Sequence, residues 1–404
     1  MFEWPILWEW IAFAVRWVHV ITAIAWIGSS FYFIALDLGL NRNGDFGGAD
    51  GEEWQVHGGG FYHIRKYLVA PAEMPAHLTW FKWESYATWL SGFALLMVVY
   101  WAGGALYLVD GSKSDLPLWQ GIVLSAAILG LGWLAYDRLC KSPLANFPTL
   151  LMLLLFVFLV GLGWGMSTVF TGRATMLHLG ALTATIMTAN VFFIIMPNQR
   201  IVVADLQAGR VPDAKYGKIA KLRSTHNNYL TLPVIFLMLS NHYPLAFGTE
   251  YNWLIAALVF LMGVTIRHFF NTMHARGPML WWTWAVTAIL FILVMWLSSA
   301  GRVSVPEEIA LTKAEQRFAS AEGFDDARDI VMGRCSMCHA REPGYEGIHR
   351  APKGVLLETD ADIARLAEGI YLQAGITRAM PPANVSWMED SERATLVAWF
   401  KNGS

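Results

Sequence analysis

The first three quarters of the chain consist of long apolar runs separated by short polar stretches. The runs lie near residues 11–36, 85–108, 118–137, 147–170, 176–204, 229–248, 252–274 and 279–300. Each run is long enough to cross a hydrocarbon core of about 30 Å as a helix. Between the last two runs, Gly277 and Pro278 end one helix and begin the next. The pattern predicts an all-α fold, a polytopic helical membrane bundle of about eight spans.

After about residue 301 the pattern becomes charged and typical of a soluble protein. We therefore expect residues 1–300 to form a transmembrane domain, 301–322 a linker and 323–404 a small soluble domain. This division predicts a tethered domain outside the bilayer.

The soluble domain has two predicted helices. One contains Asp325 and Asp329 and leads into Cys335, and a second, amphipathic helix over residues 389–401 closes the chain. This arrangement resembles the helical frame of a small class I cytochrome c.

Composition agrees with a membrane protein. Of the 404 residues, 55% are hydrophobic and 15% are charged, and the mean hydropathy is +0.41. The formal net charge of -2 offers no basic excess to neutralise phosphates, which argues against a nucleic-acid partner. The lipid bilayer is the expected partner of the apolar runs.

Basic residues predict the orientation, because they favour cytoplasmic loops. They gather in the odd-numbered loops, as Arg42, Arg65, Lys66, Lys82, Arg138, Lys141, Arg200, Arg210, Lys215, Lys218, Lys221 and Arg223. We expect a multi-pass protein of the cytoplasmic membrane whose N-terminus and soluble domain lie outside the cytoplasm.

The pentapeptide Cys335-Ser-Met-Cys338-His339 has the spacing of a covalent c-type haem attachment site. Cys335 and Cys338 would form thioethers, and His339 would ligate the iron. Met380, in a Met-Pro-Pro loop, is the expected second iron ligand, with Met388 as its competitor. The alternatives are half of a zinc site or a redox-active cysteine pair, but no second cysteine pair completes a zinc site.

Two histidines lie within apolar runs towards the predicted outer side. His19 is followed by the small residues of Ala23–Ser29, and His178 opens the fifth run. Ionisable groups inside a membrane are costly and often functional. These histidines are candidate ligands of a second haem, of b type, and His19 is also a candidate catalytic residue. Each histidine has the alternative of a simple hydrogen bond to a neighbouring helix.

A polar constellation is predicted at the cytoplasmic ends of the sixth and seventh runs. Its members are Arg223, His226, Asn227 and Asn228 before the sixth run, and Arg267, Asn271 and His274 on one face of the seventh. Together these groups suit a planar anion rich in carbonyl and N–H groups, with His226, Arg267 and His274 as catalytic candidates. A hydrated basic rim is the alternative.

The first loop begins with the glycine-rich segment 44–60 and continues with the aromatic and basic segment 61–67. This mixture is typical of an interfacial segment. We expect either a lid over a cavity or an amphipathic helix lying on the membrane surface.

Two features coincide in this chain: a first span with Arg16-Trp17-Val18-His19-Val20 and Ala25-Trp26-Ile27-Gly28, and a terminal Cys335–His339 motif. The combination resembles the bacterial membrane-bound, cytochrome-c-fused urate oxidases, also called urate hydroxylases, over essentially the whole chain. The resemblance implies oxidation of urate to 5-hydroxyisourate with water as oxygen source. It also implies one covalent haem c and electron transfer to a terminal oxidase or soluble cytochrome c.

Three other functions fit the same pattern. The chain would be a cytochrome c subunit that relays electrons from another dehydrogenase, a membrane anchor for an electron-shuttling cytochrome, or a transporter with a regulatory haem domain. In the anchor, buried polar residues would have no role.

Overall fold

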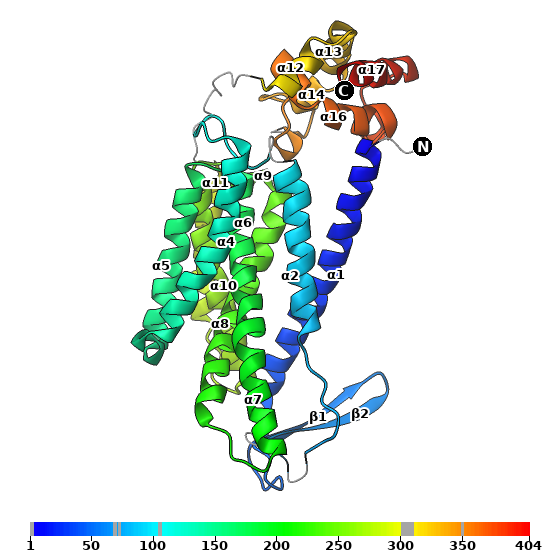
Figure 1. The fold of residues 1–404 in the computed structure, drawn as a ribbon. Coiled ribbons are helices and arrows are strands. Elements are labelled where there is room, and N and C mark those ends of the chain that lie inside the picture. The colour runs from blue at the N-terminus through cyan, green and yellow to red at the C-terminus, as the bar shows by residue number, and fades with distance from the viewer. Residues whose placement is uncertain (1–3, 68–70, 72–73, 104–106, 300–310, 349–350) are drawn as a thin grey trace. The chain divides into compact units, whose positions relative to one another are not determined.

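The structure is a computed structural model that describes residues 4–67, 71, 74–103, 107–299, 311–348 and 351–404 (Figure 1). The chain divides into two compact units. The bundle unit contains Ala14–Asn241 and Leu245–Arg302, and the C-terminal unit is mainly Val303–Ser404. Helices contain 72% of the residues and strands 4%, so the structure is mostly helical, as predicted, with one β-hairpin in addition.

The apolar runs form the long helices of the bundle. These are α1 (Trp4–Gly39), α2 (Trp83–Leu96), α4 (Leu118–Lys141), α5 (Pro148–Ser167), α6 (Gly172–Ala189), α7 (Met196–Gln207), α8 (Ala214–Leu239), α10 (Asn252–His274) and α11 (Trp282–Ser299). Within the described residues, seven helical stretches are long and apolar enough to cross a membrane. The predicted run 229–248 covers only the second half of α8 and continues through η4 (Ser240–His242) into α9 (Pro244–Phe247). The first half of α8 is polar and basic, and α8 is not among the seven.

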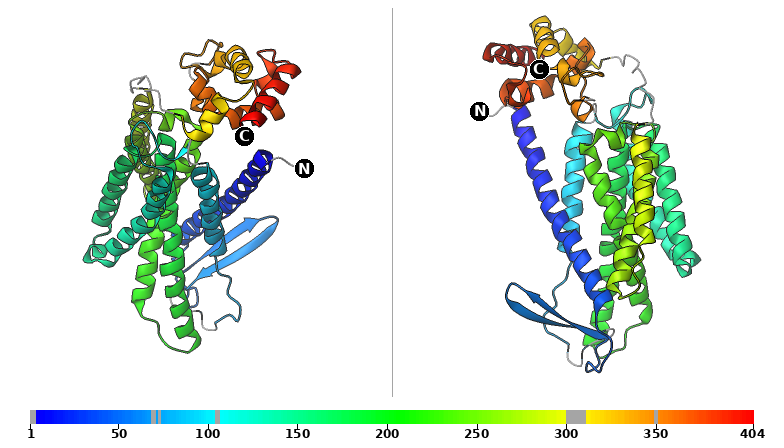
Figure 2. Two further views of the ribbon diagram at one scale, coloured as in Figure 1. Left: turned by 45° about the horizontal axis from the view of Figure 1, so that its top comes forward. Right: turned by 180° about the vertical axis from the view of Figure 1, so that it is seen from behind.

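Helix α6 lies at the centre of the bundle and packs against α2, α4, α5 and α8 (Figure 1). Leu179, Leu182 and Ile186 of α6 are almost completely buried there. Helix α10 packs against α5, α8 and α11. Helices α8 and α10 approach closely at Gly263, where an added Cβ would lie 2.4 Å from Cδ of Pro233. Figure 2 shows α1 tilted along the outside of the bundle, and it is the least buried of the seven stretches.

Two short π-helices continue α-helices of the bundle. Helix η1 (Met97–Ala102) follows α2, and η3 (Asn190–Ile195) joins α6 to α7 in one stretch over Gly172–Gln207. A π-turn holds one more residue than an α-turn, and such turns are frequent at functional sites. Both π-helices lie beside the buried polar groups described below.

The first loop contains a β-hairpin. Strands β1 (Gly51–His57) and β2 (Gly60–Lys66) pair antiparallel, and Trp54 stacks on the facing His63 with ring centroids 4.3 Å apart. Gly58 and Gly59 both have positive φ, as a tight two-residue hairpin turn requires. The prediction of a surface helix here is wrong, because paired glycines and aromatic residues favour a hairpin over a helix.

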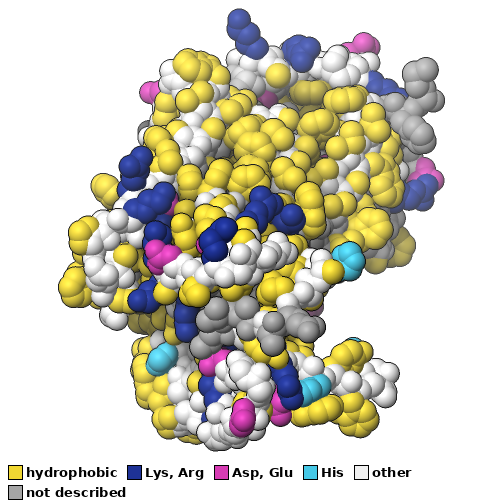
Figure 3. Space-filling model, turned by 60° about the horizontal axis from the view of Figure 1, so that its bottom comes forward, with side chains coloured by type: hydrophobic (Ala, Val, Ile, Leu, Met, Phe, Trp, Pro, Cys, Tyr) yellow, Lys and Arg dark blue, Asp and Glu magenta, His cyan; other side chains and the backbone are white. Residues whose placement is uncertain are grey.

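The bundle is basic at the end where α7 finishes and α8 starts. Figure 3 views the molecule from this end and shows Lys and Arg side chains gathered on it. One of these basic residues, Lys66, pairs with Asp37, and burial and the charge of Lys221 lower its pKa. The predicted cytoplasmic orientation depends on this concentration of basic residues at one end of the bundle.

The C-terminal unit is an assembly of short helices. They are α12 (Lys313–Ala319), α13 (Phe324–Arg334), α14 (Ser336–His339), η5 (Pro352–Gly354), α15 (Asp360–Arg365), α16 (Ala367–Ile370), η6 (Tyr371–Ile376), η7 (Pro382–Asn384) and α17 (Asp390–Gly403). The helices predicted before the cysteine motif and at the chain end are therefore present as α13 and α17. Helix α12, inside the predicted linker, packs against α15 and α17.

An ion pair joins α13 to α17 across this unit. Arg334 Nε lies 2.9 Å from Glu392 Oε1. Burial opposes ionisation of Glu392, but the backbone N–H of Glu389 and the Arg334 guanidinium outweigh it and lower the pKa of Glu392. Tyr371 and Trp399 fill the apolar core between the helices.

Candidate functional site

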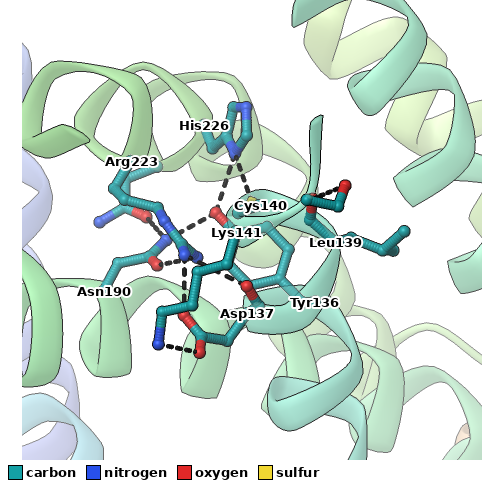
Figure 4. Close-up of polar contacts among 10 residues, drawn as sticks. Tyr136, Asp137, Leu139, Cys140, Lys141, Asn190, Arg223 and His226 are labelled. Atoms are coloured by element: carbon teal, nitrogen blue, oxygen red, sulfur yellow. Dashed lines mark hydrogen bonds and ion pairs between the residues drawn. The ribbon is translucent and has the colours of Figure 1, made fainter. Parts of the chain in front are cut away.

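A network of polar side chains, most of them buried, links α4, η3 and α8 (Figure 4). We call it the buried polar cluster, and its members are Tyr136, Asp137, Cys140 and Lys141 of α4, Asn190 of η3, and Arg223, His226 and Asn227 of α8.

An ion pair forms the centre of the buried polar cluster. Arg223 is 1% exposed, and its Nη2 donates to Asp137 Oδ1 at 2.7 Å. The other carboxylate oxygen of Asp137 accepts from Lys141 Nζ at 2.6 Å. Burying two opposite charges is tolerated only when they are paired and hydrogen-bonded. The Arg223 guanidinium is therefore already paired with a carboxylate of this chain.

Asn190 connects the ion pair to the rest of the cluster. Its Oδ1 accepts from Arg223 Nη1 at 3.2 Å, and its Nδ2 lies 2.9 Å from both Tyr136 Oη and Asn227 Oδ1. Asn190 is the first residue of η3 and is fully buried. The π-turn thus occurs where one carboxamide is bonded to groups on two other helices.

Among the described residues, His226 is held through one ring nitrogen. Its Nδ1 lies 2.8 Å from Tyr136 Oη and 3.9 Å from Cys140 Sγ. Tyr136 Oη also accepts from Asn190 Nδ2. The other ring nitrogen of His226, Nε2, is buried and has no partner among the described residues. A buried polar atom without a partner is costly, so Nε2 is available to a polar group of a ligand.

A second group of polar residues surrounds Arg267 on α10, and we call it the Arg267 cluster. Its members are Phe31, Asn228, Arg267 and Asn271, and His274 lies two turns further along α10. Arg267 is 5% exposed, Nε donates to Asn228 Oδ1 at 2.7 Å, and Nη2 donates to Asn271 Oδ1 at 3.0 Å. The Phe31 ring lies 4.5 Å from the guanidinium carbon. His274 Nδ1 is buried without a partner among the described residues.

The structure therefore divides the predicted constellation into two groups. Arg267, Asn271 and Asn228 lie together as predicted, whereas Arg223 and His226 face α4 in the buried polar cluster. Sequence reasoning did not single out the members of this cluster that come from α4 and η3. A polar residue within an apolar run, as at 137 and 190, was the available signal.

His178 is completely buried beside η1. Its Nε2 lies 2.6 Å from Ser125 Oγ, and its Nδ1 lies 2.7 Å from the Ala174 carbonyl oxygen. Trp101 Nε1 also donates to Ser125 Oγ. Both ring nitrogens are engaged, and a haem ligand would need one of them free.

His19 lies between α1 and α2. Its Nδ1 is 3.0 Å from the Thr88 carbonyl oxygen and 3.2 Å from Ser91 Oγ. A Cβ on Gly92 would come within 2.8 Å of the ring, so glycine permits this close approach. Within the described part of the chain, no hydrogen bond joins His19 to His178.

The cysteine motif in the C-terminal unit follows α13. Cys335 and Cys338 are both free thiols, and burial raises the pKa of Cys335 to about 11 and also raises that of Cys338. His339 Nδ1 lies 3.0 Å from the Val355 carbonyl oxygen. A metal-binding histidine is oriented by such a bond, which leaves Nε2 for the metal. The motif therefore fits covalent haem attachment with His339 as an iron ligand.

The two candidate methionines differ in their surroundings. Met388 is buried in the apolar core of the unit, whereas Met380 is only half-buried. The buried Arg393 of α17 donates to the carbonyl oxygens of Ala374 and Met380. These bonds fix the loop that carries Met380, which fits Met380 better than Met388 as an iron ligand.

These features describe a helical bundle of membrane-spanning composition with buried ionisable groups, followed by a small unit that bears a Cys-x-x-Cys-His motif. Residues 5–298 match the family model described as urate oxidase N-terminal, so the chain belongs to this family. Membership indicates a urate-related oxidase, an oxidoreductase of purine degradation whose substrate is urate. Comparison with curated proteins and with solved structures gave no significant match.

Proposed function

We propose that this protein oxidises urate to 5-hydroxyisourate within the bundle, with water as the source of the added oxygen. The electrons leave through a c-type haem on the C-terminal unit to a terminal oxidase or soluble cytochrome c. The observation that carries the proposal is the family match over the bundle, joined to a motif in which His339 is oriented for metal binding.

The reaction balances with water and two electrons. Urate and one water give 5-hydroxyisourate, two protons and two electrons, and the new bond joins the water oxygen to C5. The guanidinium of Arg267 suits an anionic, carbonyl-rich substrate, and the buried Nε2 of His226 is a second polar atom of the bundle without a partner among the described residues.

In the proposed holoprotein, Cys335 and Cys338 hold the haem covalently, and His339 and Met380 are the iron ligands. The haem would accept one electron at a time, and methionine ligation raises its potential. The Val355 carbonyl oxygen orients His339, and Arg393 fixes the Met380 loop.

A second haem, of b type, stays a prediction. His19 has no hydrogen bond to Nε2 within the described residues, whereas His178 would have to release Ser125 or Ala174 to become a ligand. A reduced-minus-oxidised spectrum with a pyridine haemochrome assay measures both haem types. A purely c-type signal would exclude the b-type haem.

We further propose that the protein crosses the bacterial cytoplasmic membrane several times, with its N-terminus and the haem unit in the periplasm. The seven apolar helical stretches and the basic end of the bundle support this orientation. Accessibility of single introduced cysteines to an impermeant thiol reagent, from each side of the membrane, would test it.

The proposal is tested by adding urate to the purified, haem-loaded, oxidised protein without oxygen. We expect reduction of the c-type haem, with one urate reducing two protein molecules. A control variant, Cys140→Ser, keeps the haem motif intact and should retain its haem. Absence of haem reduction in the loaded wild-type protein would refute the proposal and favour a subunit that relays electrons from another dehydrogenase.

A further inference from the structure

Arg267 is a buried cation without a carboxylate partner. Among the described residues, its hydrogen bonds go only to the carboxamides of Asn228 and Asn271. Arg223, by contrast, is paired with Asp137 at 2.7 Å. Removing a charge from water is costly unless an opposite charge compensates for it. The site around Arg267 therefore favours an anion that this chain does not supply.

The guanidinium is also left with an open edge. Nε and Nη2 are bonded to the two asparagines, but Nη1 makes no hydrogen bond within the described part of the chain. The asparagines hold the group in a fixed orientation, and the Phe31 ring lies over it. His274 Nδ1, one buried nitrogen on the same helix, has no partner there either.

We propose that the Arg267 cluster is the binding site for the urate anion, an inference that rests on the proposed function. Urate is planar and anionic at neutral pH, and its edges alternate carbonyl oxygens with ring N–H groups. Arg267 supplies the opposite charge, and Asn228 and Asn271 offer carboxamides at the same place. Phe31 supplies an aromatic face for a planar ring, and two turns further along α10, His274 has a buried ring nitrogen without a partner among the described residues.

The buried polar cluster is less suited to this task. Its guanidinium is paired with Asp137, and Lys141 donates to the same carboxylate. An anion binding to Arg223 would have to displace Asp137. The Arg267 cluster needs no such exchange, because among the described residues its cation is compensated by two carboxamides and the face of Phe31 and not by a carboxylate.

The proposal is tested by equilibrium dialysis of labelled urate against the dithionite-reduced holoprotein, in which no turnover is possible. We expect Arg267→Gln to weaken urate binding by at least tenfold, as the loss of a charge-assisted hydrogen bond predicts. The matched control is Arg276→Gln, which removes one positive charge from an exposed side chain and should leave the affinity unchanged.

A second variant separates binding from folding. Asn228→Asp keeps the acceptor for Arg267 Nε but supplies the missing carboxylate from the protein itself. We expect it to weaken urate binding by at least tenfold while thermal stability is retained or improved. The same loss of affinity should appear as a higher KM for haem reduction by urate.

The outcomes distinguish this inference from the proposed function. If wild-type protein is reduced by urate but Arg267→Gln and Asn228→Asp bind urate as tightly as wild type, the inference is wrong and the function stands. If urate neither binds to nor reduces the wild-type holoprotein, both are overturned.

Discussion

The buried ion pair between Arg223 and Asp137 allows a quantitative prediction. The side chains are 2% and 6% exposed, and the replacement Asp137→Asn removes the charge with almost no change in shape. Arg223 is then a buried cation whose remaining partners are neutral. Breaking one side of a buried ion pair costs about 3–5 kcal/mol. We therefore expect Asp137→Asn to destabilise the bundle by about that amount.

Cys140 provides the assay. It is 6% exposed and lies in the same cluster, and the chain has 3 cysteines, of which two lie in the haem motif. In the haem-loaded protein, a thiol reagent therefore labels Cys140 only when this part of the bundle opens. A loss of about 3–5 kcal/mol should raise the labelling rate by roughly two to more than three orders of magnitude.

A second variant shows whether the unpaired charge is the cause. Arg223→Gln combined with Asp137→Asn removes both charges and should recover a large part of the lost stability, because neither partner is then left unpaired. Labelling of Asp137→Asn within about 1 kcal/mol of the wild type, or a double variant less stable than the single one, would refute the reasoning.

Three further predictions concern the C-terminal unit and the helix crossing. Met380→His should lower the haem midpoint potential, since methionine ligation raises it, whereas Met388→Leu should leave the potential unchanged; equal shifts in redox titration would contradict the assignment. Because its hydrogen bonds lower the pKa of Glu392, the stability that the carboxylate contributes is present above its unfolded pKa of about 4.3 and is lost as pH falls. The free energy of unfolding of the full chain, followed by haem absorbance, should therefore fall more between neutral and acid pH in the wild type than in Glu392→Gln. An equal fall in the two proteins would argue against this role of Glu392. Gly263→Ala should lower the melting temperature of the bundle, because the new methyl group meets the facing proline ring at 2.4 Å; an unchanged melting temperature would show that the helices separate freely.

The sequence predicts the long helices well because each of them is formed by a long apolar run. The sequence does not predict which polar side chains contact one another in the folded bundle. Arg223 and Asn228 are close in sequence, but five residues along a helix turn the side chain by about 140°, so the first faces α4 and the second faces α10. That division depends on which helices pack against α8, and tertiary packing cannot be read from a single run of residues.

The hairpin over Gly51–Lys66 escaped prediction for a different reason. Its strands are short and carry exposed aromatics, so the hydrophobic pattern alone did not distinguish it from an interfacial helix. The positive φ of Gly58 and Gly59 is a backbone property that only the folded chain displays. The cysteine motif was easier, since its residue types and spacing already specify the chemistry.

The π-helix at Asn190 also affects how this protein can change its sequence. A π-turn contains one residue more than an α-turn, so deleting one residue from Asn190–Ile195 would restore α-helical winding and leave Met196–Gln207 with the same face towards α8. In a regular α-helix, a one-residue deletion would instead rotate everything beyond it by about 100°. A change of length at this position is therefore confined to the turn that carries Asn190. It would move the carboxamide that bonds to Arg223, Tyr136 and Asn227 and leave the surrounding helices in place.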